Sequence, residues 1–204
     1  MLLLFWLAAL NGQPLPVDDL IAKVVNAYGG AAAWSKVTSF REIGTVTPAM
    51  RPGQGALTRE WQRPDKLRVE IVYPTNTEIR IVNGDHGTQN GKEATGMGLD
   101  AMRLQAARLV APLLLLEKKS SLHATGNSIE IALSPSMTLT LEIDPQSGHI
   151  VRSTSKTSGT EFSTDYSDFR IVDGLLFALR EENTAGGTKT GTNEISKVEV
   201  TRVK

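Results

Sequence analysis

Apolar and polar side chains alternate along several segments of this 204-residue chain. Between Leu67 and Tyr73 every odd-numbered residue is apolar, whereas Arg68 and Glu70 stand between them. The same alternation returns at residues 79–81, 129–133, 139–143 and 175–179. A period of two is typical of a strand with one buried face. The chain is therefore predicted to form a large antiparallel sheet, whose apolar face needs a cover of helices, a second sheet or an apolar ligand.

Length and charge narrow the classes of protein that this sheet can belong to. A chain of 204 residues suits a single domain. Lysine plus arginine equal aspartate plus glutamate at 22 each, so the chain lacks the basic surface that nucleic-acid binding requires. The chain has no cysteine, which excludes disulfides, thiolate metal sites, cysteine nucleophiles and lipid attachment to a cysteine.

The first ten residues, Met1 to Leu10, are almost wholly apolar, and small and polar residues follow them. This run is shorter than the ~20 residues that span a bilayer. It resembles the apolar core of a secretory signal peptide, although the basic residues that normally precede that core are missing. We expect residues 1–13 to be a signal peptide and residues 14–204 to be one exported domain, periplasmic or secreted. A buried N-terminal strand or helix is the alternative.

Two segments have helical rather than strand periodicity. The first begins near Asp18 or Asp19, either of which can cap it, and Gly29-Gly30 supplies a left-handed stop. The second is predicted from Leu99 to Leu116, with Pro112 kinking or ending it. We expect this second helix to pack on the open sheet as a movable cover rather than to dock on a membrane. The residues assigned to that cover are Met102, Leu109 and Val110.

Strands are predicted on both sides of the second helix. The first half should hold strands at 37–47, 56–63, 66–73 and 77–82, with a hairpin turn at residues 83–85. The second half reads as a strand meander, with turns at residues 144–148, 173–174 and 185–187. The alternation in the last strand, 193–203, shifts near Lys197, where a bulge is expected.

The motifs that would indicate catalysis or a metal centre are weak. His86, His123 and His149 lack the spacing of a zinc pair and fall in predicted turns or strand starts. Residues 186–192 lack the Lys-Ser/Thr ending of a phosphate loop, and no Gly-x-Ser-x-Gly elbow occurs. Asp165, Asp168 and Asp173 fit turn chemistry better than a carboxylate pair. We therefore expect no catalytic residue, metal or cofactor.

The apolar sheet face remains as the candidate functional surface. If the strands curl and the helices cover them only in part, this face becomes a cavity for an acyl chain. Its predicted lining is Leu67, Val69, Ile71, Ile79, Ile81, Leu139, Leu141 and Phe177. The alternative is that the same residues form a closed core.

Three sequence features resemble the LolA/LolB-like superfamily of periplasmic lipoprotein carriers. The first is the helix ending in Ala27-Tyr28-Gly29-Gly30 and leading through Trp34 to Gly44. The second is Asp144-Pro145-Gln146-Ser147-Gly148, which is similar to the Asp-Pro-x-x-Gly turn of that family. The third runs from Tyr166 to Phe177 and matches its Tyr-x-Asp-x-x-x-x-Asp-Gly pattern. The likeness covers most of the mature chain.

This resemblance implies an α+β, mainly β fold, in which an unclosed antiparallel barrel wraps over a few helices. It also implies a monomeric, non-catalytic carrier or sensor for a lipid or a lipoprotein acyl chain, with envelope proteins as further partners. Ala178 departs from the family, which often has proline there, so the strand edge is expected to be less protected. A closed interaction or envelope-sensing module is the main alternative, and an uncharacterised hydrolase is a third class.

Overall fold

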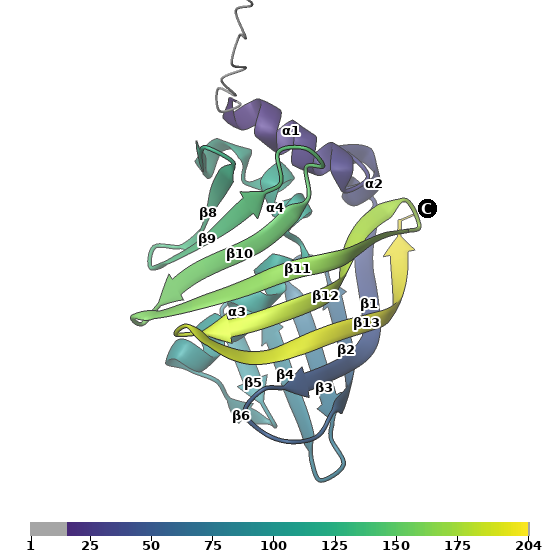
Figure 1. The fold of residues 1–204 in the computed structure, drawn as a ribbon, viewed down its shortest axis with the longest axis vertical. Coiled ribbons are helices and arrows are strands. Elements are labelled where there is room, and N and C mark those ends of the chain that lie inside the picture. Colours follow the sequence, from purple (N-terminus) through teal and green to yellow (C-terminus); the bar gives the residue numbers. More distant parts are fainter. Residues whose placement is uncertain (1–15, 204) are drawn as a thin grey trace, which may run out of the picture.

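The computed structural model describes residues 16–203 and contains one large antiparallel sheet (Figure 1). The predicted signal peptide lies outside the described residues. The strands are β1 (Val37–Pro48), β2 (Gly55–Gln62), β3 (Lys66–Val72), β4 (Thr77–Asn83), β5 (His86–Gln89), β6 (Lys92–Glu93), β7 (Leu122–Thr125), β8 (Ser128–Ser134), β9 (Met137–Ile143), β10 (Ile150–Thr157), β11 (Thr160–Val172), β12 (Leu175–Ala185) and β13 (Thr188–Arg202). The bounds of β1 to β4 lie within one residue of the predicted ones.

The order of the strands explains why the sheet does not close. The 13 strands run β6-β5-β4-β3-β2-β1-β13-β12-β11-β10-β9-β8-β7, so two meanders join where β1 pairs with β13. The edge strands are β6 and β7, and the chain between them forms α3 (Gly96–Leu109) and α4 (Ala111–Glu117). A short 3₁₀ turn, Lys119–Ser121, leads back into β7. The predicted unclosed antiparallel sheet with a few covering helices is confirmed.

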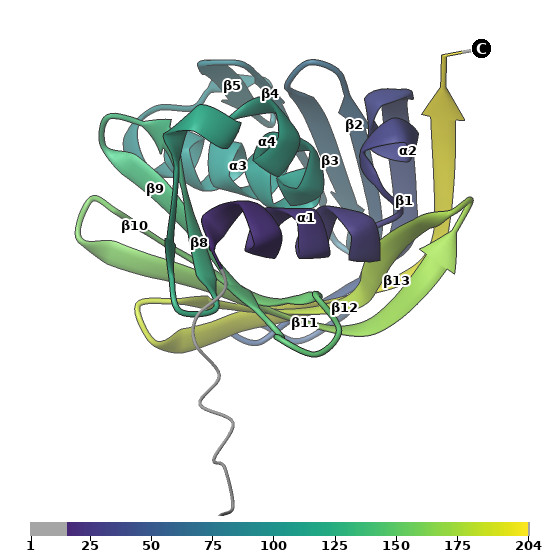
Figure 2. The ribbon, with the colours of Figure 1, turned by 90° about the horizontal axis from the view of Figure 1, so that it is seen from above.

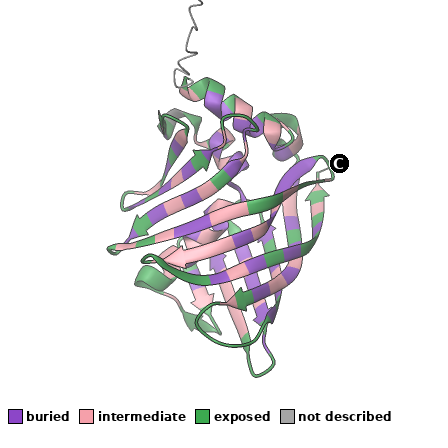
Figure 3. Cartoon of the chain, viewed as in Figure 1, coloured by how far each residue is buried: buried purple, intermediate pink, exposed green. Residues whose placement is uncertain are grey.

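Figure 2 shows the helices inside the curve of the sheet, with α1 (Val17–Ala27) lying across one end. Along the strands, buried and exposed residues alternate as a half-buried sheet requires (Figure 3). The buried side of α1 consists of Leu20, Ile21, Val24 and Val25. The short α2 (Ala31–Ser35) contributes the buried Trp34. The helices thus supply the cover that the apolar sheet face needs.

The start of α1 differs from the prediction, whereas its end agrees. Pro16 is the N-cap residue, and Asp18 and Asp19 lie in the first turn, so the predicted aspartate cap is wrong. Acidic side chains in the first turn still interact favourably with the helix dipole. Gly29 and Gly30 have φ values of 106° and 89°, which confirms the left-handed stop.

The end of α1 is fixed against the sheet by close contacts. A Cβ on Gly29 would stand 2.2 Å from the carbonyl oxygen of Gly174, in the turn between β11 and β12. The hydroxyl of Tyr28 accepts a hydrogen bond from the Ile150 amide at 3.1 Å. Trp34 Nε1 donates to the Tyr28 carbonyl at 2.9 Å. The N-terminal and C-terminal features of the family resemblance therefore meet in space.

The second predicted helix is two helices in the structure. Its break lies at Val110, whose amide bonds to the Ala107 carbonyl three residues earlier. Pro112 stands in the first turn of α4, where its missing N–H leaves no hydrogen bond unmade. The proline therefore begins a helix and does not kink one.

The predicted irregularity in the last strand is confirmed. Ile43 pairs with Lys197 and Gly44 pairs with Ile195, which leaves Ser196 as the extra residue of a bulge. Its hydroxyl donates to the Ile43 carbonyl at 3.1 Å.

The pairing of β12 agrees with the expectation of a less protected strand edge at Ala178. Ala178 pairs with Phe169 of β11, whereas the pairing of β12 with β13 begins only at Arg180.

Candidate ligand-binding site

Six of the eight predicted cavity residues lie on the concave face of the sheet. Each of the six is at most 6% exposed, and they are Leu67, Val69, Ile71, Leu139, Leu141 and Phe177. The aromatic rings of Phe177 and Phe40 lie 5.7 Å apart, and Trp34 of α2 lies 6.5 Å from Phe177. The helices therefore cover most of this face.

The prediction that Ile79 and Ile81 line the cavity is wrong, because the sheet places these residues on its opposite face. Directly paired residues of an antiparallel sheet share a face. Ile79 pairs with Glu70 and Ile81 with Arg68, whereas Val82 pairs with the buried Leu67. The turn between β3 and β4 therefore transfers the inward positions from odd to even numbers. A register change of one residue exchanges the two faces of a strand.

The predicted cover residues lie in and beside α3, which bridges the gap in the sheet. This helix contacts β4 and β5 on one side and β9 and β10 on the other. Met102 and Val110 are buried and Leu109 is half-buried. These three residues do not lie on one face of the helix. Val110 lines one cavity beside α3, and Leu109 lines a different one.

The first of these cavities, the apolar groove, has a volume of about 190 Å³. Its apolar lining is Trp61, Val82, Ala106, Ala107, Val110, Leu114, Leu133 and Met137. Asp65, Asp85, Arg103 and Lys118 are its charged lining residues, and Pro64 and Gly84 complete the lining. Trp61 is 1% exposed, and within residues 16–203 its Nε1 has no hydrogen-bond partner.

The second cavity, the polar chamber, has a volume of about 330 Å³. Strand residues lining it are Val46, Pro48, Arg59, Ile71, Arg80, Thr164, Tyr166, Glu181, Asn183, Thr190, Gly191 and Asn193, and Tyr73 lines it directly after β3. From α3, Ala101, Gln105, Arg108 and Leu109 complete it. Only Ile71 of the predicted cavity residues lies in this chamber, so sequence reasoning missed nearly all of it.

A buried ionic cluster forms one wall of the chamber. Arg59 of β2 donates to both carboxylate oxygens of Glu181 of β12, at 2.7 and 2.9 Å. Its Nη2 also lies 2.7 Å from Oε2 of Glu42, on the neighbouring strand β1. Asn193 of β13 donates to Glu181 at 2.8 Å. The cluster therefore joins four adjacent strands, β2, β1, β13 and β12.

The two carboxyl groups of this cluster differ in their pKa. Burial raises the pKa of Glu42 to about 7, and the nearby Arg59 offsets that effect only in part. Glu181 is also desolvated, but the charge of Arg59 and the hydrogen bonds from Arg59 and Asn193 hold its pKa below the usual range. Glu181 receives three hydrogen bonds, whereas the Glu42 contact with Arg59 lies outside hydrogen-bond geometry. Glu181 is thus the carboxylate that stays ionised.

The sequence did contain a signal for this cluster. Arg59 lies two residues from both Leu57 and Trp61, and Glu181 lies two residues after Leu179. In a strand these charged side chains must point to the same side as their apolar neighbours. A charge at an inward position predicts a buried partner. The partner could not be named, because Arg59 and Glu181 meet only through the pairing of β1 with β13.

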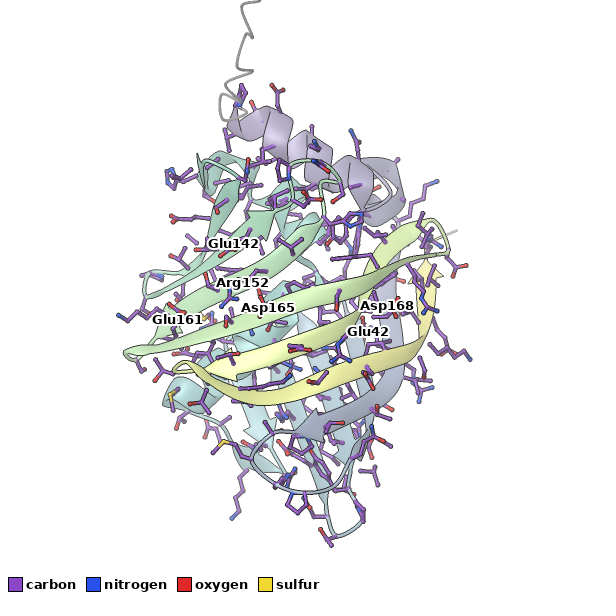
Figure 4. The ribbon with its side chains drawn as sticks, in the orientation of Figure 1. Glu42, Glu142, Arg152, Glu161, Asp165 and Asp168 are labelled. Atoms are coloured by element: carbon purple, nitrogen blue, oxygen red, sulfur yellow. The ribbon has the colours of Figure 1, made fainter. Side chains whose placement is uncertain are left out.

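The aspartates set aside as turn chemistry pair with arginines or lie in turns. Asp165 lies 2.8 Å from Arg152 and Asp168 lies 3.1 Å from Arg170. Glu142, Arg152 and Asp165 stand on the neighbouring strands β9, β10 and β11 (Figure 4). Asp173 has a φ of 49° in the turn between β11 and β12. Among the described residues, no group of three or more His, Asp or Glu side chains is placed to hold a metal ion.

Residues 16–203 include no helix with the length and apolar character to cross a bilayer.

Comparison with known proteins gives a result for structure but none for sequence. No protein-family model matches the chain, and no curated protein sequence matches it. A LolA superfamily protein from Nitrosomonas europaea has a similar structure, with a TM-score of 0.55 and 7% identity over 93% of this chain and 96% of that one.

Two further solved structures are similar. One is described as an outer membrane lipoprotein-sorting protein domain from Vibrio parahaemolyticus, with a TM-score of 0.53, 7% identity and coverage of 91% and 93%. The other is a DUF1329 family protein from Desulfovibrio piger, with a TM-score of 0.50, 7% identity and the same coverage. At this identity the comparison concerns the fold. The chain therefore has the fold of the LolA superfamily, as its sequence resemblance predicted.

Proposed function

We propose that the protein is a non-catalytic periplasmic carrier that binds a lipid or lipoprotein acyl chain. The observation that carries this proposal is the apolar groove, which lies at the gap of an unclosed sheet between α3, α4, β4 and β8. Ligand sites are typically apolar clefts with a few polar groups, and this groove has that composition. The names of the LolA and lipoprotein-sorting neighbours favour the same class of ligand.

The groove must enlarge to hold a whole acyl chain. Its volume of about 190 Å³ is below the roughly 300–1,000 Å³ of typical ligand sites. We infer that α3 moves outward as a cover over the concavity. Gly96, with a φ of 54°, and Gly98 lie at one end of α3, and the break at Val110 lies at the other. Short irregular segments at both ends of an element allow such motion at low cost.

Export is part of the proposal. It depends on the apolar run from Met1 to Leu10 and on the name of the Vibrio parahaemolyticus neighbour, which refers to outer membrane lipoprotein sorting. The intact mass of protein from a secreting host should place the mature N-terminus between Asn11 and Val17. Recovery of an uncleaved chain in the cytoplasm would contradict export.

Two substitutions in α3 test where the acyl chain binds. Ala107 lines the apolar groove, so Ala107→Phe should fill it and abolish binding of a fluorescent fatty acid. Ala101 lines the polar chamber on the other side of the same helix, so Ala101→Phe is the matched control and should retain binding. Mass spectrometry of lipids extracted from the purified wild-type protein identifies the natural ligand. No bound lipid and no probe binding by the wild type would contradict the carrier proposal.

A closed interaction or envelope-sensing module is the second candidate. It is favoured by the near-complete burial of the six inward-facing predicted cavity residues under the helices. A protein of this kind would act through its outer surface and would need no movement of α3. The fatty-acid experiment separates the two candidates, because the closed module binds no probe in either variant or in the wild type.

A further inference from the structure

The polar chamber has a charge balance that the carrier proposal does not explain. We propose that the chamber binds an oxyanion, a phosphate or carboxylate group, which the guanidinium of Arg108 holds. The chamber lies on the opposite side of α3 from the apolar groove, so this proposal stands independently of acyl-chain binding. Its volume of about 330 Å³ falls within the range of ligand sites.

Of the three arginines that line the chamber, two have carboxylate partners. Arg59 is paired with Glu181 and Glu42 at 2.7 Å each. Arg80 is paired with Glu78 at 2.8 Å. No carboxylate of residues 16–203 lies within 4.0 Å of Arg108, which is largely buried and whose pKa burial lowers. Glu181 attracts Arg108 from beyond that distance but is itself paired directly with Arg59, so an anion in the chamber would compensate the remaining charge of Arg108.

The hydrogen bonds around Arg108 point to the same kind of ligand. Its Nη2 donates to the Phe162 carbonyl at 3.0 Å, while its Nε is buried without a partner in the described part of the chain. The side-chain carbonyls of Gln105 and Asn183 accept from Arg80 and Thr164, so their NH₂ groups remain available as donors. A site with several donors and a cation binds oxyanions in preference to cations or apolar groups.

The rim of the chamber also carries positive charge. Arg51 stands 3.8 Å over the ring of Tyr73, which lines the chamber. Glu78 serves both Arg51, at 3.8 Å, and Arg80, at 2.8 Å. These three groups therefore sum to one positive charge, which attracts an anion toward Arg108.

The test measures the thermal unfolding midpoint of the full chain at constant ionic strength. Three probes are compared, namely inorganic phosphate, a monoacyl glycerol phosphate below its micelle concentration and the phosphate-free monoacylglycerol. A ligand of the folded state raises the midpoint by mass action. A rise of the midpoint with inorganic phosphate would show that a small anion is sufficient for binding. A response only to the acyl phosphate identifies a lipid headgroup.

Substitution of Arg108 assigns the response to this residue. Arg108→Gln should weaken phosphate binding roughly tenfold or more, since it removes a charge-assisted hydrogen bond. Without ligand the unfolding midpoint of Arg108→Gln should equal or exceed that of the wild type, because the substitution removes a largely buried charge that has no directly paired carboxylate. Arg170→Gln makes the same charge change at the exposed Arg170–Asp168 pair and should leave the response intact. Arg108→Lys keeps the positive charge and should retain part of the response to phosphate.

Three results would overturn the proposal. The first is a wild-type response to phosphate and acyl phosphate no greater than the response to chloride. The second is an equal response of Arg108→Gln and wild type. The third is an equal response to acyl phosphate and monoacylglycerol together with no response to inorganic phosphate. If Arg108→Gln does not fold, the comparison of Arg108→Lys with wild type decides in its place. Ala107→Phe should bind phosphate as the wild type does, whether or not the groove binds acyl chains.

Discussion

The apolar groove and the polar chamber lie on opposite sides of α3, and the concave face of one sheet forms a wall of both. In the groove, Trp61, Val82 and Met137 face the helix, whereas Arg59, Glu181 and Asn193 face it in the chamber. Trp61 and Arg59 are only two residues apart in β2. One strand thus contributes an apolar wall to one cavity and an ionic wall to the other.

The difference teaches that the concavity is divided rather than uniformly apolar. The chamber is almost twice the volume of the groove, at about 330 Å³ against about 190 Å³. The larger space is therefore also the more polar one, and an acyl chain alone would leave Arg108 without a directly paired anion. The two cavities fit different chemical groups, and α3 separates them.

The largest effect is expected at the ionic wall. Glu181→Gln removes the ionised partner of Arg59 and should cost roughly 3–5 kcal/mol of unfolding free energy. Glu42→Gln should cost about 1 kcal/mol or less near pH 6, where Glu42 is largely protonated and glutamine is similar in shape and charge. Urea unfolding of both variants measures the difference. Equal costs would mean that the two glutamates share the charge of Arg59 evenly.

A second comparison enlarges two inward side chains, one in the closely packed core and one in the polar chamber. Leu141 is 1% exposed beside a pocket of only about 50 Å³, so Leu141→Phe should overpack the core at a cost of roughly 1–3 kcal/mol. Ile71 lines the polar chamber, so the ring of Ile71→Phe can enter free space and should cost less than about 1 kcal/mol. Unfolding midpoints in urea test both values. A larger cost for Ile71→Phe would show that the chamber is closed in solution.

The pH dependence of stability should reflect Glu42. Its pKa is about 7 in the folded protein against an ordinary value of 4.5, so the folded state holds more protons between these two pH values. The contribution of Glu42 to stability is therefore complete below pH 4.5 and is lost as pH rises through about 7. The lowered pKa of Glu181 has the opposite effect. Its contribution to stability is present above the ordinary pKa of a glutamate and is lost as the pH falls below that value. Glu42→Gln should flatten the plot of unfolding free energy against pH between pH 4.5 and 7. An unchanged slope of that plot would exclude Glu42 as its source.

The smallest effect concerns the helix that divides the cavities. Amide hydrogen exchange should be faster in α3 than in β3, because β3 is hydrogen-bonded on both sides by β2 and β4. A Cβ on Gly96 or Gly98 would meet no atom within 4 Å, so the start of α3 is loosely held. Protection of α3 equal to that of β3 would contradict its proposed role as a movable cover.

Local patterns predicted most of the secondary structure. The period of two located β1 to β4, and the Gly29-Gly30 and Asp173-Gly174 pairs located two chain reversals with positive φ values. These features depend on neighbouring residues alone. The faces were predicted less well, as Ile79 and Ile81 show, because the face of β4 depends on how the turn from β3 sets its register.

The alternation in the sequence by itself determined that this chain forms a large antiparallel sheet with one largely apolar face and helices to cover it, and the family resemblance added that the sheet is unclosed. Only the tertiary structure decided what that concavity contains. Arg59 and Glu181 are 122 residues apart and become partners because β1 pairs with β13. The position of α3 then divides the space, since the chain between the two edge strands must return through the concavity. Alternation is a local property, whereas a cavity is made by residues that only long-range pairing brings together.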